Sequence, residues 1–268
     1  MVWRVLLSSM ILSVVCLVPL GMKWEIEKKL AIGAALLISI FTSSIVSGLT
    51  LVWDLRFSHI LTLEFFLIVI TAASLLLWRF YRDPERIPPE FQNTILSPAD
   101  GRILYVKRIR NGEAPVSHKR GRTFSLGDFV GINVFPLGGY LVGISMNFLD
   151  VHVNRAPITG KIALLKRIKG NFLSLKRKDA VIENERVLTV IDNGHFRVGI
   201  VQIASRLVRR IVSYLPEGHE VGRGQRIGMI RFGSQVDLVI PDLSSLRVEV
   251  KAGEKVKAGI SIVAYFDE

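Results

Sequence analysis

The chain has 268 residues, half of them apolar, and its mean hydropathy of +0.39 is high for a purely soluble domain. Its 35 Lys and Arg residues outnumber the 23 Asp and Glu residues, so the net charge is +12. In a chain with membrane helices, this balance favours attraction to an anionic lipid surface over nucleic-acid binding. The single cysteine, Cys16, excludes a disulfide framework or a cysteine-based metal site within one chain.

Three long apolar runs occupy the first part of the chain, at residues 5–22, 30–53 and 60–78. A helix needs about 20 apolar residues to cross a bilayer, and Glu64 near the start of the third run is tolerable close to an interface. The first run could also be a signal peptide, but it is long for one and no small-residue cleavage site follows it. Residues 1–80 are therefore predicted to form a membrane anchor with two to three transmembrane helices.

The basic residues in the short loops predict the orientation of this anchor, because Lys and Arg favour the cytoplasmic side. Residues 23–29 contain three lysines, and Arg79, Arg82 and Arg86 follow the third run, whereas the loop 54–59 contains one arginine. Both basic flanks fit the same side of the membrane. We therefore expect a protein integral to the cell membrane, with the rest of the chain in the cytoplasm.

The composition changes near residue 80, and residues 81–268 are predicted to form one β-rich domain. Short runs rich in Val, Ile and Leu alternate with turn residues, which indicates many short strands in a sandwich or barrel. Residues 202–214 instead show helical periodicity, with an apolar face and an Arg-rich face. We expect a helix that packs on a sheet with its arginines in water, and the less favoured alternative places them near lipid headgroups. The expected strands are 102–109, 130–134, 142–147, 161–168, 187–191, 196–203, 236–240, 246–250 and 260–266.

Glycine-centred turns recur in this domain, at Asp100-Gly101, Thr159-Gly160, Ala252-Gly253 and Ala258-Gly259. The repeated turn and strand pattern resembles that of biotinyl/lipoyl-type barrel-sandwich domains. The expected fold class is therefore mainly β, a barrel-sandwich-like domain with a few helices, preceded by N-terminal transmembrane helices.

Four segments hold residue types that carry chemistry, although each is a weak signal alone. An Asp-Gly turn such as the one at Asp100 is ordinary, a lone His152 is more often a structural histidine, and Gly233-Ser234 alone would be a tight turn. The four segments are 97–101 (SPADG), 150–157 (DVHVNRAP), 202–210 (QIASRLVRR) and 222–234 (GRGQRIGMIRFGS).

In this order and spacing, the four segments resemble the phosphatidylserine decarboxylase family over roughly residues 80–268. The stretch 82–86 (RDPER) just ahead of the first segment and the stretch 225–241 (QRIGMIRFGSQVDLVIP) are also similar to that family. The Gly233-Ser234 pair stands where the family cleaves itself. The combination is specific, whereas the membrane segment before it is not diagnostic.

The resemblance implies that the Ser234 hydroxyl attacks the Gly233 carbonyl and converts the amide into an ester. β-Elimination then frees residues 1–233, and residue 234 becomes a pyruvoyl cap on the fragment 234–268. Loss of CO2 from an α-amino acid leaves an electron pair on the α-carbon, and a carbonyl that forms a Schiff base with the substrate amine accepts it. No metal and no diffusible cofactor is implied.

The family analogy also assigns the residues that assist this reaction. A serine hydroxyl is a weak nucleophile that needs an adjacent base. The analogy makes His152 that base, with Asp100 as the carboxylate that orients its ring. Gly233 suits a strained turn because it has no Cβ. The analogy names no residue that stabilises the tetrahedral oxyanion.

The chain departs from the best-known bacterial members at one position of the second segment. Those members carry two histidines three residues apart, whereas here His152 is followed by Arg155. Arg155 cannot act as a base at neutral pH, but it could bind the substrate carboxylate or phosphate. The work of two histidines therefore falls on His152 or is shared with Arg155. Asp150 is a second candidate carboxylate beside His152.

The expected function is the conversion of phosphatidylserine to phosphatidylethanolamine, or the same reaction on an ether-linked archaeal lipid. The expected partners are the phospholipid substrate, the membrane and a second copy of the chain in a homodimer, but no nucleic acid. One alternative is a non-enzymatic membrane-tethered carrier or adaptor, for which Lys251 before Ala252-Gly253 is a poor modification site. Another is a pyruvoyl decarboxylase of a soluble amino acid, which gives no reason for the apolar helices.

Overall fold

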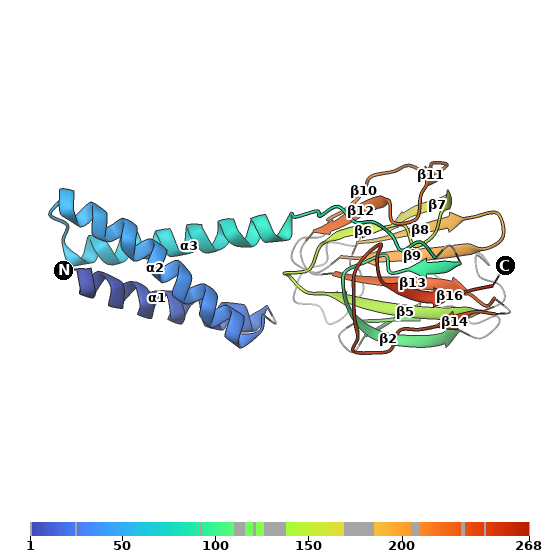
Figure 1. Cartoon of the computed structure of the whole chain (residues 1–268), viewed down its shortest axis with the longest axis horizontal. Coiled ribbons are helices and arrows are strands. Elements are labelled where there is room, and N and C mark those ends of the chain that lie inside the picture. The colour runs from blue at the N-terminus through green and yellow to red at the C-terminus, as the bar shows by residue number, and fades with distance from the viewer. Residues whose placement is uncertain are drawn as a thin grey trace. The chain divides into compact units, whose positions relative to one another are not determined.

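The computed structural model divides the chain into two compact units, Met1–Arg82 and Asp83–Glu268, which we call the helical unit and the β unit (Figure 1). The structure describes residues 2–24, 26–91, 93–109, 116–119, 122–125, 138–168, 185–204, 210–231, 234–243 and 245–267.

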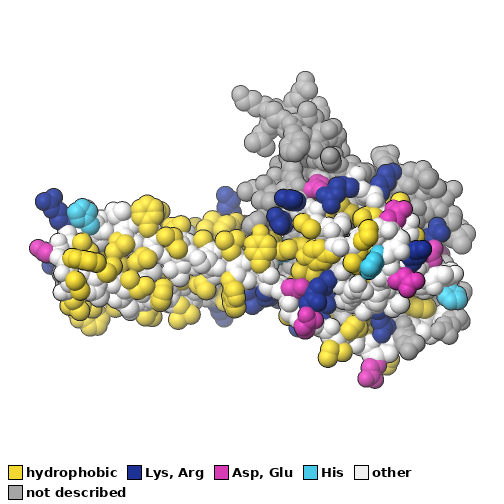
Figure 2. Space-filling view, turned by 90° about the horizontal axis from the view of Figure 1, so that it is seen from above, with side chains coloured by type: hydrophobic (Ala, Val, Ile, Leu, Met, Phe, Trp, Pro, Cys, Tyr) yellow, Lys and Arg dark blue, Asp and Glu magenta, His cyan; other side chains and the backbone are white. Residues whose placement is uncertain are grey.

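The helical unit consists of three long helices, α1 (Val2–Lys23), α2 (Lys28–Val52) and α3 (Phe57–Phe80). Each has the length and the apolar composition to cross a membrane, so the expected N-terminal apolar helices are confirmed. Hydrophobic side chains cover much of their outer surface, as the yellow atoms in Figure 2 show, and Leu37 and Trp78 are among the exposed ones. An apolar surface of this extent is typical of a membrane contact.

Small polar residues hold α1 against α2. The hydroxyl oxygens of Ser9 and Thr42 lie 2.7 Å apart, and the Ser13 hydroxyl donates to the carbonyl oxygen of Ala35 at 2.7 Å. Within a membrane, interhelical hydrogen bonds of this kind contribute about 0.6 kcal/mol each. Their short side chains also let the two helix backbones approach closely, so the same residues provide both the bonds and the packing.

Glu64 of α3 lies inside the helical unit. Its side chain is fully buried, and its Oε1 accepts a hydrogen bond from the Ser8 hydroxyl of α1 at 3.1 Å. Ionisable residues within membrane segments usually face the interior of the bundle and pair with a neighbour there. The Ser8–Glu64 bond therefore joins α1 to α3, as the Ser9 and Ser13 bonds join α1 to α2.

An antiparallel sheet of eight strands forms the centre of the β unit. Its order is β11 (Glu220–Val221), β7 (Gly160–Ile168), β8 (Arg186–Asp192), β9 (Arg197–Ile203), β13 (Ser234–Pro241), β5 (Gly139–Met146), β2 (Gly101–Ile109) and β15 (Lys255–Val256). Three smaller sheets accompany it. They are β1 (Thr94–Leu96) with β16 (Ile262–Tyr265) and β14 (Arg247–Val248), β10 (Arg210–Ser213) with β12 (Arg226–Arg231) and β6 (Val153–Arg155), and β3 (Val116–Lys119) with β4 (Arg122–Ser125). The mainly β fold class is thereby confirmed.

Alternating side chains place apolar clusters on both faces of the large sheet. On β13, Val236 and Leu238 belong to the larger cluster, whereas Val239 belongs to a second cluster with Leu188 of β8. β13 also pairs with β5 on one edge and with β9 on the other. A strand enclosed on its edges and its faces has a strongly specified register, because a slip would turn its apolar side chains to the wrong face.

Most of the expected strands coincide with observed ones. The runs 102–109, 161–168 and 196–203 correspond to β2, β7 and β9, and the signal in each was the clustering of β-branched residues between turn residues. The expected strand 130–134 lies outside the described residues.

The predicted helix over residues 202–214 is wrong. The segment begins inside β9, which pairs with β8 and β13, and Arg210–Ser213 form β10, which pairs with β12. Ladder hydrogen bonds and the burial of Ile211 in the larger cluster override the helical spacing of the apolar residues. The described residues of the β unit contain strands and turns and no helix.

Candidate active site

The expected cleavage site stands where the chain crosses from one sheet to another. β12 ends at Arg231 in a three-stranded sheet, and β13 begins at Ser234 in the middle of the eight-stranded sheet. Ser234 pairs with Met146, the last residue of β5. Gly233 and the side chain of Ser234 lie outside the described residues. The sheet thus fixes the backbone of Ser234 at the first position of its central strand.

Two strand pairings connect His152 to this position. His152 directly precedes β6, which pairs with β12, and the Ile230 N–H donates to the carbonyl oxygen of His152 at 3.2 Å. A short turn after Met146 leads from β5 to His152. His152 is fully buried. The fold therefore ties His152 and Ser234 to the same two strands, β5 and β12.

The ring of His152 is oriented by a backbone carbonyl. Its Nδ1 lies 2.8 Å from the carbonyl oxygen of Asp150. A carbonyl oxygen only accepts, so Nδ1 carries the proton and donates it, and in the neutral ring the lone pair is then on Nε2. The Asp150 carboxylate makes a different contact, because its Oδ2 accepts from the Asn147 N–H at 2.7 Å. Asp150 thus reaches His152 through its backbone, while its side chain caps the turn before it.

Asp100 forms a buried ion pair with Arg86. Its Oδ1 and Oδ2 accept from the two Nη atoms of Arg86 at 2.5 and 2.8 Å, and Oδ1 also accepts from the Ala258 N–H at 2.8 Å. Gly101 follows at a φ of +146°, where a Cβ would overlap the carbonyl oxygen of Ser145. The structure therefore shows Asp100 as part of a rigid turn. Its role in orienting His152 stays a prediction.

Arg155, three residues after His152, is buried and bound within the protein. One Nη donates to the Gly224 carbonyl at 2.9 Å, and the other donates to the Pro84 carbonyl at 3.0 Å and to Asp83 Oδ1 at 3.2 Å. Burial and the neighbouring Arg226 lower the pKa of Arg155, which Asp83 opposes. Both Nη groups of Arg155 are therefore bonded within the protein, so Arg155 holds structure around the site. The binding of the substrate by Arg155 stays a prediction.

A buried amide pair joins three of the four chemistry-bearing segments. Gln202 Nε2 donates to Asn154 Oδ1 at 2.8 Å, and Asn154 Nδ2 donates to the Pro98 carbonyl at 3.3 Å. The same carbonyl accepts from the Arg155 N–H at 2.9 Å. Sequence reasoning gave Gln202 and Asn154 no role, although both stand inside the segments it singled out. Asn154 bonds to Gln202 and to Pro98, which are both distant from it in the sequence, and no local residue spacing indicates these contacts.

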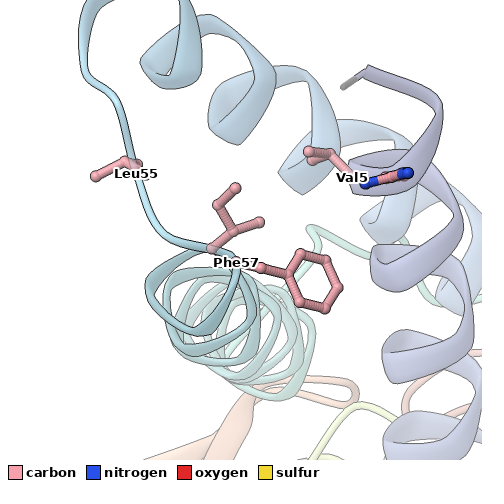
Figure 3. A pocket seen from close by; sticks show the side chains of 5 residues that line it. Val5, Leu55 and Phe57 are labelled. Atoms are coloured by element: carbon pink, nitrogen blue, oxygen red, sulfur yellow. The ribbon is translucent and has the colours of Figure 1, made fainter.

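Two cavities are lined by other residues. A cavity of about 340 Å³ in the helical unit is lined by Val5, Leu55 and Phe57, with Arg4 and Ile60 (Figure 3). A second cavity, of about 440 Å³ in the β unit, has a polar lining. Neither lining includes His152 or Asp100, so neither is assigned to the reaction. The residues of the second lining are Thr159, Gly160, Lys161, Asp192, Asn193, Glu220, Val221 and Gly222.

Several decarboxylase proenzymes are similar in sequence to this chain over most of their own length. Two proteins, from Methanocaldococcus jannaschii and Methanothermobacter thermautotrophicus, are each 43% identical to it, over 75% and 70% of this chain and 95% and 80% of theirs. Both are named "Putative archaetidylserine decarboxylase proenzyme". A protein from Chlorobium limicola, named "Phosphatidylserine decarboxylase proenzyme", is 37% identical over 70% of this chain and 77% of its own.

A family model described as phosphatidylserine decarboxylase matches residues 74–264, which include the whole of the candidate site. The matched region also contains all four segments that carried the resemblance. The chain therefore belongs to the phosphatidylserine decarboxylase family and is a decarboxylase.

Proposed function

We propose that this chain is a membrane-anchored proenzyme that breaks its own peptide bond between Gly233 and Ser234 and then removes CO2 from the serine headgroup of a phospholipid. The observation that carries the proposal is the setting of His152. It is a buried imidazole with its Nδ1 proton held by a carbonyl, on the strand pair that leads into Ser234. A base with a fixed tautomer is what activation of a serine hydroxyl requires.

In the maturation step, His152 accepts the proton of the Ser234 hydroxyl through Nε2, and the serine oxygen attacks the carbonyl carbon of Gly233. The bond between the Gly233 carbonyl carbon and the Ser234 nitrogen then breaks, while the new bond to the Ser234 oxygen stays. His152 passes the proton to the released Ser234 amine, so an ester replaces the amide. Removal of the Cα proton of residue 234 then expels the Gly233 carboxylate and leaves dehydroalanine. Hydrolysis releases ammonia and leaves a pyruvoyl group on the fragment 234–268.

In turnover, the pyruvoyl carbonyl supplies the electron sink that decarboxylation of an α-amino acid needs. The chain's own residues must bring the headgroup to it and return a proton to the α-carbon. We assign that proton transfer to His152, because an imidazole can both accept and donate a proton. A buried position favours this role, because bulk water cannot compete for the proton inside the site.

Asp100 acts indirectly in this proposal. Its ion pair with Arg86 fixes the segment 97–101, and the Pro98 carbonyl of that segment accepts hydrogen bonds from the backbone and side chain of the strand after His152. The carboxylate would thus orient His152 through β6, while the carbonyl of Asp150 makes the direct contact with the ring.

The substrate class follows from the relatives and from the anchor. According to their names, the relatives act on phosphatidylserine or on archaetidylserine. These two lipids share the serine headgroup but differ in the lipid backbone, so only the headgroup is assigned. Helices that can span a membrane would keep the β unit, which we place on the cytoplasmic side, close to that headgroup. Tethering of this kind raises the effective concentration of the reacting groups, and the net charge of +12 would attract an anionic lipid.

Intact-mass measurement of the purified full chain tests maturation. We expect two fragments, 1–233 and 234–268, with the smaller one lacking a free amino terminus and reacting with a hydrazine. Ser234→Ala should stay as one chain, and Ser245→Ala, at a serine whose hydroxyl accepts from the Asp267 N–H, should split like the wild type. A folded wild-type chain that stays whole and carries no reactive carbonyl contradicts the proposal. The alternative would then be a non-enzymatic carrier modified at Lys251.

Release of labelled CO2 tests the substrate. Matured protein in vesicles should act on phosphatidylserine or on archaetidylserine, and the comparison of the two identifies the lipid backbone. Free serine and phosphoserine should release little CO2. A protein that prefers the free amino acid over both lipids would be a soluble-substrate decarboxylase, and the lipid assignment would be wrong.

A further inference from the structure

Two arginines stand directly opposite each other beside the site. Arg155 of β6 and Arg226 of β12 are register partners in the pairing that connects the strand after His152 to the strand before residue 234. Like charges at directly opposed positions of an antiparallel pair destabilise the pairing. This pair of strands therefore carries a repulsion that another part of the chain has to balance.

Asp83 supplies that balance from outside both strands. Its Oδ1 lies 3.2 Å from Nη2 of Arg155, and its Oδ2 lies 2.5 Å from Nε of Arg226. Glu85 adds a second contact, because its Oε1 lies 2.6 Å from Nη2 of Arg226. The hydrogen bond with Arg226 lowers the pKa of Glu85, and the carboxylates of Glu85 and Asp83 raise the pKa of Arg226. One carboxylate thus bridges both cations, and a second supports the more exposed one.

Residues 83–91, which we call the strap, follow α3 and bind the β unit along their length. Arg86 pairs with Asp100. Arg223 donates to the Pro89 carbonyl at 2.6 Å and also to the carbonyl of Phe91. The strap therefore contacts the segment of Asp100, the strand after His152 and the loop before β12. Asp83 is its first residue, only three positions after the end of α3 at Phe80.

We infer that Asp83 is a positioning residue for the reaction. By neutralising Arg155 and Arg226 it holds β6 against β12, and that pairing sets the place of His152 relative to residue 234. The inference rests on the proposed self-cleavage, whose rate reports that placement. Asp83 and the backbone oxygens of Pro84 and Gly224 together accommodate the guanidinium of Arg155 beside the site.

The rate at which freshly synthesised full chain splits in lipid vesicles tests the inference. Asp83→Asn should slow the splitting by about tenfold or more, because removing one partner leaves the charge of Arg155 buried and uncompensated. Asp83→Glu keeps the charge and should recover part of the rate. The matched control is Asp242→Asn, which should split at the wild-type rate. Asp242 forms an exposed ion pair with Arg108, with 3.4 Å between Nη2 and Oδ2.

The double variant Asp83→Asn with Arg226→Gln separates charge balance from simple loss of fold. It removes the repulsion together with its counter-charge, so it should split faster than Asp83→Asn alone. A double variant no faster than the single one, or a single variant as fast as the wild type, overturns the inference and leaves the proposed function standing. A wild-type chain that never splits overturns the proposed function, and this inference with it.

Discussion

The helical unit and the β unit bury polar side chains in different ways. In the helical unit, the described buried polar side chains other than Glu64 carry hydroxyls, and those of Ser9, Ser13 and Thr42 bond to one another or to carbonyl oxygens of the facing helix. In the β unit, whole charges are buried, as in the pair of Arg86 with Asp100, whose side chains are 6% and 10% exposed. A lost hydroxyl bond leaves a carbonyl that is still bonded within its helix, whereas a lost ion-pair partner leaves a buried charge. We therefore expect the loss of a buried hydroxyl in the first unit to be tolerated and the loss of an ion-pair partner in the second to be costly.

The largest expected effect concerns the group assigned to the chemistry. His152→Ala should slow self-cleavage by about 10²- to 10⁴-fold, the usual contribution of a positioned general base. The measurement is the fraction of split chain over time on a denaturing gel. The control is His195→Ala, at an exposed turn of the same unit, which should mature normally. Equal maturation of both variants would remove His152 from the reaction.

Arg86→Gln should produce the largest loss of stability. It leaves the Asp100 carboxylate buried with the Ala258 N–H as its remaining described donor, and breaking a buried pair in this way costs about 3–5 kcal/mol. Thermal unfolding of the full chain in detergent measures the loss. Arg108→Gln breaks an ion pair whose arginine side chain is 68% exposed and should change the midpoint little. Similar shifts for the two variants would mean that burial does not set the cost.

Ser9→Ala tests the tolerance of the helical unit. The variant loses the contact with Thr42 and a bond to the Ser39 carbonyl, and at about 0.6 kcal/mol for each bond we expect a loss of about 1 kcal/mol. Ser44→Ala is the matched control, because the exposed Ser44 hydroxyl bonds within its own helix, to the Ile40 carbonyl. Unfolding in a detergent series compares the two. A loss of several kcal/mol for Ser9→Ala would show that hydroxyls in this unit are as critical as ions in the other.

The smallest expected effect is a pH-dependent one at the surface of the β unit. The hydrogen bond from Arg197 and then the Gly194 N–H lower the pKa of Asp192. A carboxyl whose folded pKa is lowered stabilises the fold above its unfolded pKa and loses that contribution as the pH falls through its folded pKa. Arg197→Gln should therefore cost under about 1 kcal/mol at neutral pH and less at acid pH. Denaturant unfolding at both pH values measures this, and an equal cost at both would contradict it.

The sequence predicted the fold where side-chain patterns are local. The apolar runs gave all three helices, and the β-branched runs gave β2, β7 and β9, because length and composition are enough to indicate a span or a strand. The pattern failed at residues 202–214, where Ile203 and Ile211 stand at helical spacing but belong to two different strands, β9 and β10. Their pairing partners on β12 and β13 are distant in the chain, and no local period reports them.

The candidate site was only partly predictable for the same reason. Motif resemblance singled out His152, but its ring contacts a backbone carbonyl, and any residue at position 150 would offer one. The partner of Asp100 is Arg86, fourteen residues away on the other side of β1. Arg155 looked like a free cation in the sequence, and its partners Asp83 and Gly224 come from two separate loops. The sequence shows which residues are charged, but only the folded structure shows which of them form ion pairs.

The place of β13 in the large sheet has a consequence for the mature protein. The short product of the proposed cut would consist of residues 234–268, and its strand β13 lies between β5 and β9, both from the long product. β15 and β16 of the same product pair with β2 and β1 of the long one. The two products are interwoven, so neither can leave without dismantling the sheet. The nicked protein should migrate as one particle in native conditions and separate only when it is denatured, with residue 234 kept on the central strand of a sheet that both products form.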